Sequence, residues 1–483
     1  MASSATSHLA KIQHVVVLML ENRSFDHMLG LLYPGKKTPS GQPFEGLTGN
    51  ETNVDASGNA VKVFPISPNQ QNAYFMPGAD PGEGYAHTNA QLFGTSTAPT
   101  PPVATCSGFV TDYAATLPWD AKNNRKVLAG TTANDIMGVF PPTMVPVLSG
   151  LAKGYAVCDH WFSSVPTETM PNRAFACAAT SEGHLDDSKQ ARALTVPSIF
   201  GRLSDAKLPW AIYGYNEEPL TRADFPDTKD APNSHFGKFA QFQAAAKAGK
   251  LGAYTFLEPE WSATGNSQHP NYDVALGEKL IHDVYYALRS NAAAWDATLF
   301  IIVYDEHGGL YDHVPPPRGA VPPDTFAGED GFDFTRFGLR VPCVLVSPLI
   351  AAGTVLRAPA GAAPYDHTSI LKTIENRWGV PALTKRDAAA PDVSPVLTLT
   401  QPRTDDPLHG VTVPASAASP YSDSDPPSHL QEVHAQLLSM LPLPDAHGGV
   451  HHTPPALKTS ADAAKYIHAR TEAWKAPKAG TTG

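Results

Sequence analysis

Two apolar segments rich in β-branched residues each run straight into a pair of oxygen-bearing side chains. His14 to Met19 leads into Glu21-Asn22, and Thr298 to Tyr304 leads into Asp305-Glu306. Short apolar runs of this kind are typical of strands that are buried on both faces of a sheet. In open α/β sheets, ligands gather at the carboxyl ends of such strands. The two junctions therefore indicate an α/β sheet and predict a site at its edge.

Further strand and helix patterns alternate along the chain. Strands are predicted over residues 156–162 and 341–347, and helices over 146–155, 274–290 and 369–378, with another beginning near Asn172. Strands interleaved with helices predict a three-layer α/β/α sandwich. The 46 prolines and 37 glycines indicate long loops, and residues 34–105 are expected to form an extended loop layer at the sheet edge.

The end of the chain has a different composition from the rest. Residues 387–427 are rich in Pro, Ala, Ser, Thr and Asp, and short helical patterns follow over 430–440 and 461–474. We therefore expect a catalytic core over residues 1–395 and a C-terminal extension over residues 396–483, with a Pro/Ser-rich link and short helices.

Charge and cysteine content exclude several classes of protein. A formal net charge of −11 and a pI near 5.9 disfavour nucleic-acid binding and allow at most peripheral contact with a membrane. The four cysteines lack the close spacing of zinc or redox sites. Residues 1–11 contain no export-signal pattern, and the run 15–20 is too short to span a bilayer, so we expect a cytoplasmic protein or a mature secreted form.

The acidic junctions have the chemistry of a metal site. Glu21, Asn22, Asp305 and Glu306 together offer enough oxygen donors for one hard divalent cation, which would neutralise a phosphoester and align a nucleophile. These donors leave the identity open among calcium, magnesium, manganese and zinc. Glycines 308 and 309 would let the backbone approach a ligand closely. The alternative is that each acidic pair caps a helix or lies on the surface.

Thr169 is the candidate nucleophile. It stands two residues before Pro171, and proline favours the first turn of a helix, so the hydroxyl is expected near a positive helix terminus that suits a phosphate. A nearby cation would lower the pKa of the hydroxyl and allow attack on phosphorus, giving a phosphothreonine that water hydrolyses. The alternative role for Thr169 is a helix cap.

Several histidines lie in polar loops, where an imidazole could donate to a phosphate or protonate a leaving alkoxide. Each could equally be a structural histidine. The candidates and their polar neighbours are His87 with Asn89, His235, His269 with Asp273, and His367 beside Asp366.

Four segments carry a resemblance to a known family. Glu21 to His27, Thr169 to Arg173, Asp305 to Gly309 and Asp312 to Pro317 resemble the phosphoesterase family of bacterial phospholipases C, plant non-specific phospholipases C and certain bacterial acid phosphatases. The resemblance runs from about residue 12 to residue 380 in the same order. It implies an alkaline-phosphatase-like fold and a phosphoric ester hydrolase.

The resemblance also implies roles for individual residues. It places the metal on Glu21, Asn22, Asp305 and Glu306, with Thr169 as the attacking hydroxyl that also touches the metal. It places His87, Asn89, His235 and His269 at phosphate-binding or leaving-group positions, and it gives Arg173 and His367 the task of orienting the metal ligands, to which we add Asp273 and Asp366 as polar neighbours.

The leading hypothesis is therefore a phospholipase C that converts a glycerophospholipid, with phosphatidylcholine as the first guess, to diacylglycerol and a phosphorylated head group. A broad-specificity acid phosphatase is the alternative, although that branch of the family has serine where this chain has Thr169. A silent binding protein should lack a ligand or the nucleophile, and none is missing. A sulfatase should have cysteine or serine at the threonine position. The sequence leaves the oligomeric state open.

Overall fold

The computed structural model describes residues 8–187, 193–441 and 454–476, and in this part of the chain one eight-stranded sheet forms the centre of the fold. In order across the sheet, the strands are β13 (Thr354–Leu356), β6 (Ala156–Cys158), β12 (Cys343–Val346), β11 (Thr298–Tyr304), β1 (His14–Leu20), β10 (Tyr254–Leu257), β8 (Trp210–Gly214) and β9 (Phe236–Lys238). Strand β12 runs antiparallel to both neighbours, while the other pairs are parallel, so the sheet is mixed.

The two apolar segments that define the sequence form the central strands β1 and β11. They pair in parallel along their whole length, with His14 opposite Thr298 and Leu20 opposite Tyr304. Every residue of β11 is buried, as is all of β1 after His14. Because the two strands are adjacent and in register, the side chains that follow them emerge side by side at one edge of the sheet.

Helices cover both faces of the sheet. On one face, α5 (Pro146–Gly154), α10 (Phe239–Lys247) and α12 (Ala292–Trp295) pack with or around α11 (Val274–Arg289). On the other face, α13 (Thr368–Trp378) packs on α6 (Thr169–Ala178), which contacts α8 (Ile199–Asp205). The predicted α/β fold with three layers is confirmed.

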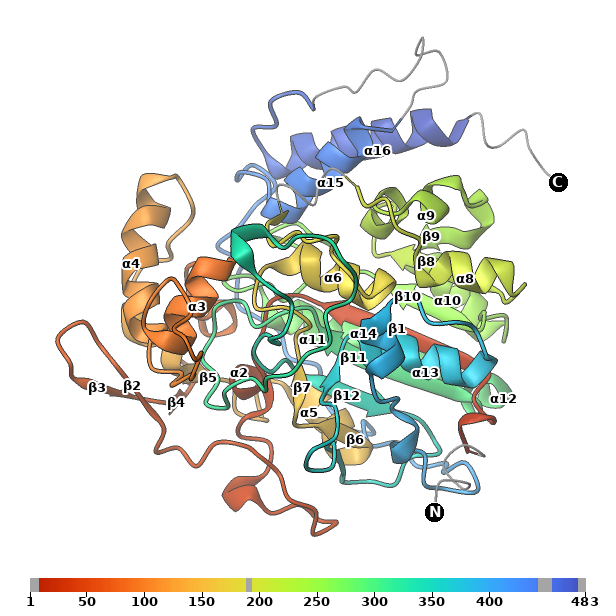
Figure 1. Cartoon of the computed structure of the whole chain (residues 1–483), viewed down its shortest axis with the longest axis horizontal. Helices are drawn as coiled ribbons and strands as arrows, with labels where there is room; N and C mark the ends of the chain where they lie inside the picture. Colours follow the sequence, from red (N-terminus) through yellow and green to blue (C-terminus); the bar gives the residue numbers. More distant parts are fainter. Residues whose placement is uncertain (1–7, 188–192, 442–453, 477–483) are drawn as a thin grey trace.

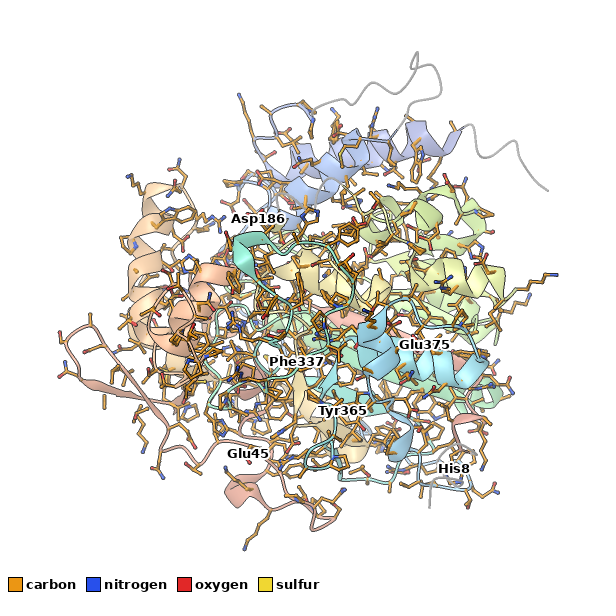
Figure 2. All side chains as sticks on the ribbon, in the orientation of Figure 1. His8, Glu45, Asp186, Phe337, Tyr365 and Glu375 are labelled. Carbon is orange, nitrogen blue, oxygen red and sulfur yellow. The ribbon has the colours of Figure 1, made fainter. Side chains whose placement is uncertain are left out.

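The core is continuous across these layers. Apolar side chains of the central strands and of both helical layers form one large buried cluster. Tyr365 and Phe337 lie in the central part of the molecule in Figure 2, and Tyr365 stacks on Trp161 with ring centroids 6.1 Å apart. The four cysteines are buried and form no disulfide.

The region 34–105 contains more structure than a loop layer. A hairpin joins β2 (Thr52–Val54) to β3 (Ala60–Lys62), and α3 (Tyr85–Phe93) packs against α4 (Phe109–Lys122) at the left of Figure 1. The expectation of a structureless layer is wrong for α3. Its buried side chains are mostly polar, among them Thr88, Asn89 and Gln91. Apolar residues therefore do not recur at helical spacing, and the sequence pattern does not predict this helix.

The C-terminal region packs against the core. Helices α15 (His429–Ser439) and α16 (Ser460–Lys475) lie together at the top of Figure 1, and α15 contacts the short helix η4 (Leu220–Ala223). The two helices share an apolar cluster with Met170 and Trp261 of the core. The division at residues 395 and 396 stays a prediction.

The remaining elements are short. They are α2 (Phe25–Leu29), α9 (Pro226–Asp230), α14 (Lys385–Ala389), β4 (Phe64–Pro65), β5 (Gly138–Val139), β7 (Trp161–Phe162) and β14 (Tyr365–Asp366), with further short helices η1 (Pro34–Lys36), η2 (Ala73–Phe75), η3 (Ala133–Met137), η5 (Asn233–His235), η6 (Glu329–Gly331) and η7 (Ser394–Val396). No helix among the described residues has both the length and the apolar character needed to cross a bilayer.

Candidate active site

The carboxyl ends of β1 and β11 bring the four candidate metal ligands into one cluster. One carboxylate oxygen of Asp305, Oδ1, accepts hydrogen bonds from the backbone N–H groups of Asn22 and Glu306, both at 2.8 Å. Glu21, Asn22, Asp305 and Glu306 are all buried. Asn22 has a φ of 55°, a left-handed conformation that is uncommon for a residue with a side chain and is often found at functional sites.

Thr169 lies against this cluster. It is the first residue of α6 and is buried, and its hydroxyl donates a 2.9 Å hydrogen bond to Oδ1 of Asn22. The helix begins three residues earlier than the sequence pattern suggests, so the hydroxyl does stand at a helix N-terminus. The candidate nucleophile and the candidate ligands therefore share one site.

The predicted donors have the oxygen chemistry of a divalent-cation site. Among the described residues, however, the ligand atoms that lie within 4.8 Å of one another beside this site are those of Asp80, Glu83 and His269, not those of Glu21, Asp305 and Glu306. Metal binding by the predicted four residues therefore stays a prediction. Oε2 of Glu21 and Oε1 of Glu306 are buried and have no hydrogen-bond partner in the described part of the chain. Burial raises the pKa of Glu21, of Asp305 and of Glu306, because several carboxylates share a space with little water. A bound cation would supply the missing partners and favour the charged carboxylates.

The glycines after Glu306 allow this crowding. Gly308 has a φ of 64°, and an added Cβ there would lie 2.1 Å from the carbonyl oxygen of Asn22. At Gly309, an added Cβ would lie 2.5 Å from the carbonyl oxygen of Gly82. A residue larger than glycine would therefore push the two strand ends apart.

Arg173 and His367 hold Asp305 in place. Nε of Arg173 donates to Oδ2 of Asp305 at 2.9 Å. His367 donates from Nε2 to the carbonyl oxygen of Asp305 and accepts at Nδ1 from the indole N–H of Trp161. Burial lowers the pKa of His367 to about 4, so its ring is neutral and its tautomer is set by these two partners. Both residues thus contact Asp305, and their predicted task of orienting metal ligands stays a prediction.

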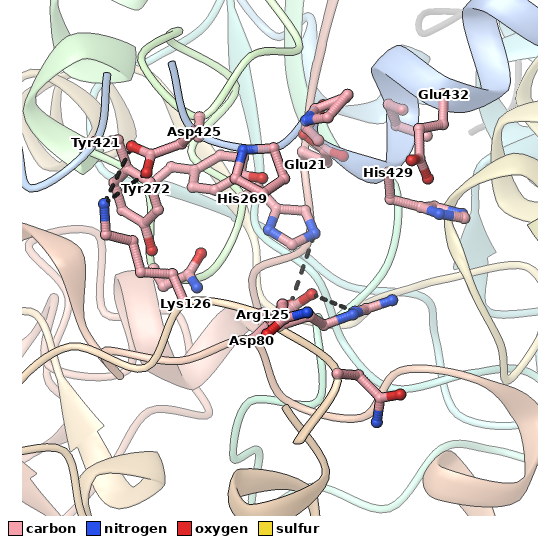
Figure 3. Close-up of a pocket in the computed structure, with 18 residues that line it drawn as sticks. Glu21, Asp80, Arg125, Lys126, His269, Tyr272, Tyr421, Asp425, His429 and Glu432 are labelled. Carbon is pink, nitrogen blue, oxygen red and sulfur yellow. Dashed lines mark hydrogen bonds and ion pairs between the residues drawn. The ribbon is translucent and has the colours of Figure 1, made fainter. Parts of the chain in front are cut away.

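His269 faces the site from the loop before α11. It borders a cavity of about 320 Å³ together with Glu21, and its Nε2 lies 3.8 Å from Oδ1 of Asp80 and 3.9 Å from Oε2 of Glu83. Figure 3 shows the imidazole of His269 directed at Asp80. Glu83 accepts a hydrogen bond from the side-chain amide of Asn22, so it belongs to the same cluster.

Three further residues at the site escaped the sequence analysis. Oδ1 of Asp187 accepts from the backbone N–H of Met170, and its own N–H donates to Glu168, both at 2.8 Å. Nε2 of His429 lies 3.1 Å from Oδ2 of Asp187. Burial alone would lower the pKa of His429, but Asp187 and Glu168 raise it to about 9, so the ring is protonated at neutral pH. The C-terminal region thus contributes a cation to the wall of the site.

These residues had no recognisable local signal. His429 is 260 residues from Thr169 in the sequence, and only the packing of α15 on the core brings it near. Glu83 stands in a Pro-Gly-Glu-Gly turn that reads as an ordinary loop.

Two of the candidate residues on α3 point elsewhere than expected. His87 is half-exposed and its Nδ1 lies 2.9 Å from Oδ1 of Asp112, which raises its pKa; it borders a second cavity beside the site. Asn89 is buried, and its side-chain oxygen accepts two hydrogen bonds of 3.2 Å from Arg336. The structure therefore gives Asn89 a supporting role in the loop layer.

The structure does not bring His235 to the site. Its ring stacks on Trp210 with centroids 3.9 Å apart, and its Nδ1 donates to the carbonyl oxygen of Trp210 at 2.8 Å. Trp210 is the first residue of β8, and β8 runs in the same direction as β1 through β10. His235 thus lies at the end of the sheet opposite to the cluster, and the expected phosphate-binding role is wrong in its placement.

Asp273 and Asp366 also have structural partners. Asp273 is the N-cap of α11, where it accepts from the backbone N–H of Ala275 and from the hydroxyl of Ser416. Asp366 accepts from Thr368 and forms an ion pair with Arg386 at 3.0 Å. Asp366 thus supports the loop that carries His367, whereas Asp273 fixes the start of a helix.

Several solved structures overlap with this fold over part of their length. A protein in the alkaline phosphatase superfamily from Vibrio parahaemolyticus covers 69% of this chain and 82% of its own, with a TM-score of 0.28 and 14% identity. The lipoteichoic acid synthase from Listeria monocytogenes covers 52% of this chain and 69% of its own, with a TM-score of 0.30 and 13% identity.

Sequence comparison gives much closer relatives. Non-specific phospholipase C3 of Arabidopsis thaliana is 35% identical over 427 residues, which are 84% of this chain and 77% of the relative. Non-specific phospholipase C6 of the same plant is 36% identical, over 86% of this chain and 78% of the relative. Phospholipase C A of Mycobacterium tuberculosis is 28% identical, over 79% and 75%.

Residues 12–381 also match the sequence model of the phosphoesterase family. This range contains the four candidate metal ligands, Thr169 and His269. The family match, the relatives and the cluster agree on one chemistry, the hydrolysis of phosphoric esters. The chain is a phosphoric ester hydrolase and belongs to the phosphoesterase family.

Proposed function

We propose that the protein is a phospholipase C that uses Thr169 as its nucleophile. The observation that carries the proposal is the hydrogen bond from the Thr169 hydroxyl to Asn22 inside a cluster of buried carboxylates. The names of its relatives, non-specific phospholipase C and phospholipase C, support a lipid substrate. The proposed reaction releases diacylglycerol and a phosphorylated head group.

In this mechanism, Glu21, Asn22, Asp305 and Glu306 hold one divalent cation. When bound, the cation supplies charge neutralisation for the phosphate oxygens and lowers the pKa of a nearby hydroxyl. Asn22 orients the hydroxyl of Thr169, which attacks phosphorus and displaces the glycerol oxygen.

Proton transfer involves the residues around the nucleophile. Glu83 accepts a hydrogen bond from the side-chain amide of Asn22 and so fixes the amide that orients Thr169, while the hydroxyl proton of Thr169 is lost to water. His269 protonates the departing glycerol oxygen of diacylglycerol. Water then attacks the phosphothreonine diester and releases the phosphorylated head group. Arg173 keeps Asp305 in position throughout.

A phosphomonoesterase is the second candidate, and one observation favours it. The 320 Å³ cavity beside Glu21 and His269 is lined mainly by polar and charged side chains, among them Arg125, Lys126 and Asp425. A small polar phosphoester could bind in such a cavity, because it has no acyl chains that need an apolar surface.

Product analysis separates the two candidates. Purified protein with added divalent metal is offered phosphatidylcholine in mixed micelles and, separately, p-nitrophenyl phosphate. Release of diacylglycerol with phosphocholine is the expected result. Turnover of the monoester with intact lipid would instead support the phosphatase.

Metal removal is expected to change stability as well as activity. A cation whose free concentration is 100 times its dissociation constant stabilises the folded protein by about 2.7 kcal/mol. Chelation should therefore abolish turnover and lower the midpoint of thermal unfolding, and readdition of calcium, magnesium, manganese or zinc should identify the ion that restores both.

The variant Glu306→Gln tests whether the cluster is the binding site. It should lose the metal-dependent shift in midpoint. Without metal it should be at least as stable as the wild type, because an uncharged amide replaces a buried carboxylate whose Oε1 has no partner among the described residues, and the amide oxygen can still accept from Gly308. The exposed Glu472→Gln serves as the matched control. A midpoint that does not respond to chelation in the wild type would contradict the assignment.

A further inference from the structure

A second cavity of about 340 Å³ lies beside the site and has no role in the proposed mechanism. Its volume is within the range of small-molecule sites. Two of its lining residues belong to the site: Glu168 directly precedes Thr169, and Glu83 accepts the hydrogen bond from Asn22. Its other walls come from α4, from the loop at residues 80–84 and from His429 of α15. A ligand in this cavity would lie next to a phosphate held at Thr169.

Asp120 is the unusual member of this lining. It is 1% exposed, and neither carboxylate oxygen has a hydrogen-bond partner within the described residues. Burial, followed by the charge of Asp80, raises its pKa to about 7. A buried carboxylate without a partner is unfavourable by itself, and a cation brought by a ligand would relieve it.

Trp119, the preceding residue, offers a cation-binding ring to the same cavity. It is 52% exposed, which is unusual for tryptophan, and it lines the cavity beside Asp120. The guanidinium of Arg125 already lies 5.1 Å from the centre of its ring, and Arg125 also pairs with Asp80 at 3.1 Å. The ring is therefore placed to hold a cation. An aromatic face beside a carboxylate is the arrangement that recognises quaternary ammonium groups.

The charge of the second cavity distinguishes it from the first. Each cavity has a basic side chain beside an aromatic ring: in the first, Lys126 lies 4.7 Å from the ring centre of Tyr421 and pairs with Asp425, as Arg125 lies beside Trp119 in the second. The difference lies in the acidic groups, because Lys126 already pairs with Asp425 whereas Asp120 has no partner among the described residues. The second cavity contains more acidic groups than basic ones, and Asp186, one of them, lies between α4 and α15 in the view of Figure 2. Its acidic lining residues are Asp80, Glu83, Asp120, Glu168 and Asp186, against Arg125, His87 and His429.

We propose that this second cavity binds the cationic amine of the substrate's head group, with the carboxylate of Asp120 and the ring of Trp119 as the recognising groups. The inference rests on the proposed phospholipase C function and deepens it. Diacylglycerol leaves in the first step, so the head group stays on phosphorus and the subsite acts in both steps. The substrates it selects are phospholipids with an amine head group, such as choline or ethanolamine.

The test compares lipids that differ in head-group charge. Full-length metal-loaded protein is assayed with phosphatidylcholine and with phosphatidylglycerol in matched mixed micelles, and the ratio of the two kcat/KM values is measured. Asp120→Asn should lower this ratio roughly tenfold by loss of the cation contact, with kcat/KM for phosphatidylglycerol unchanged within about twofold. Asp283→Asn, on the surface of α11, controls for the loss of one negative charge.

Trp119→Ala provides a second variant that is expected to fold, because the side chain is half-exposed. It should lower the same ratio, and Trp119→Phe should restore part of it. The subsite would be overturned if the wild type hydrolyses both lipids and neither substitution changes the ratio of kcat/KM values. For this outcome to count, the variants must keep the unfolding midpoint of the wild type. Wild-type protein that hydrolyses neither lipid would overturn the phospholipase function, and the subsite with it.

Discussion

Replacement of Thr169 by alanine is expected to lower kcat by at least about 10³-fold, since the covalent step has no other attacking group at that position. Among the described residues, the side-chain hydrogen bond that would be lost is the one from the hydroxyl to Asn22. The unfolding midpoint and the metal-dependent shift should stay close to the wild type. The measurement is kcat on the best lipid substrate and on p-nitrophenyl phosphate.

Thr169→Ser is the matched control, because it keeps the hydroxyl and removes one methyl group. It should retain activity within about tenfold and should form a covalent phosphoserine in place of phosphothreonine. Acid-quenched protein after brief exposure to substrate, examined by mass spectrometry, should carry the phosphoryl adduct on residue 169. Full activity of Thr169→Ala would remove the threonine from the mechanism.

Arg340→Met is expected to lower the free energy of unfolding by about 3–5 kcal/mol, the range for breaking a buried ion pair. Arg340 is fully buried and donates at 2.9 Å to both Asp312 and Asp26. Its remaining N–H groups reach the carbonyl oxygens of Glu45 and Asp159. The substitution leaves two buried carboxylates without their cation.

Denaturant unfolding of Arg340→Met beside the exposed Arg318→Met measures the difference. The control should change stability by less than about 0.5 kcal/mol. The carboxylates of Asp26 and Asp312, with His313, are also spaced closely enough to hold a metal ion, but Arg340 already supplies the positive charge there. A loss below about 1 kcal/mol in Arg340→Met would show that the network contributes little.

The sequence predicts the centre of the fold well because the signals there are local. β1 and β11 are apolar along their length, and their ends are marked by polar pairs, so both the strands and the proximity of Asn22 to Asp305 follow from the pattern. The metal-binding role of these residues stays a prediction. The same reasoning places Thr169 at a helix start, with the boundary shifted by three residues. In these cases the candidate functional residues stand at the end of a strand or at the start of a helix, where the sequence pattern itself changes.

Tertiary contacts decide the rest of the site, and no local pattern reports them. Glu83 and Asp187 become part of the site only through hydrogen bonds to Asn22 and Met170. His429 reaches it through the docking of a distant helix. His235 has the right residue type in a polar loop, but it packs on Trp210 at the start of β8, at the opposite end of the sheet, because strand direction and order are set by packing.

The position of β1 in the middle of the sheet has a consequence for synthesis on the ribosome. Strand β1 pairs with β10 and β11, whose residues are translated more than 230 positions later. Until then an apolar, β-branched segment is without its partners, which makes it a hazard for intermolecular association. Folding with such distant pairings is slow. A nascent chain of this protein is therefore expected to need holding by chaperones until at least Tyr304 has left the ribosome, and catalytic activity can arise only after that point.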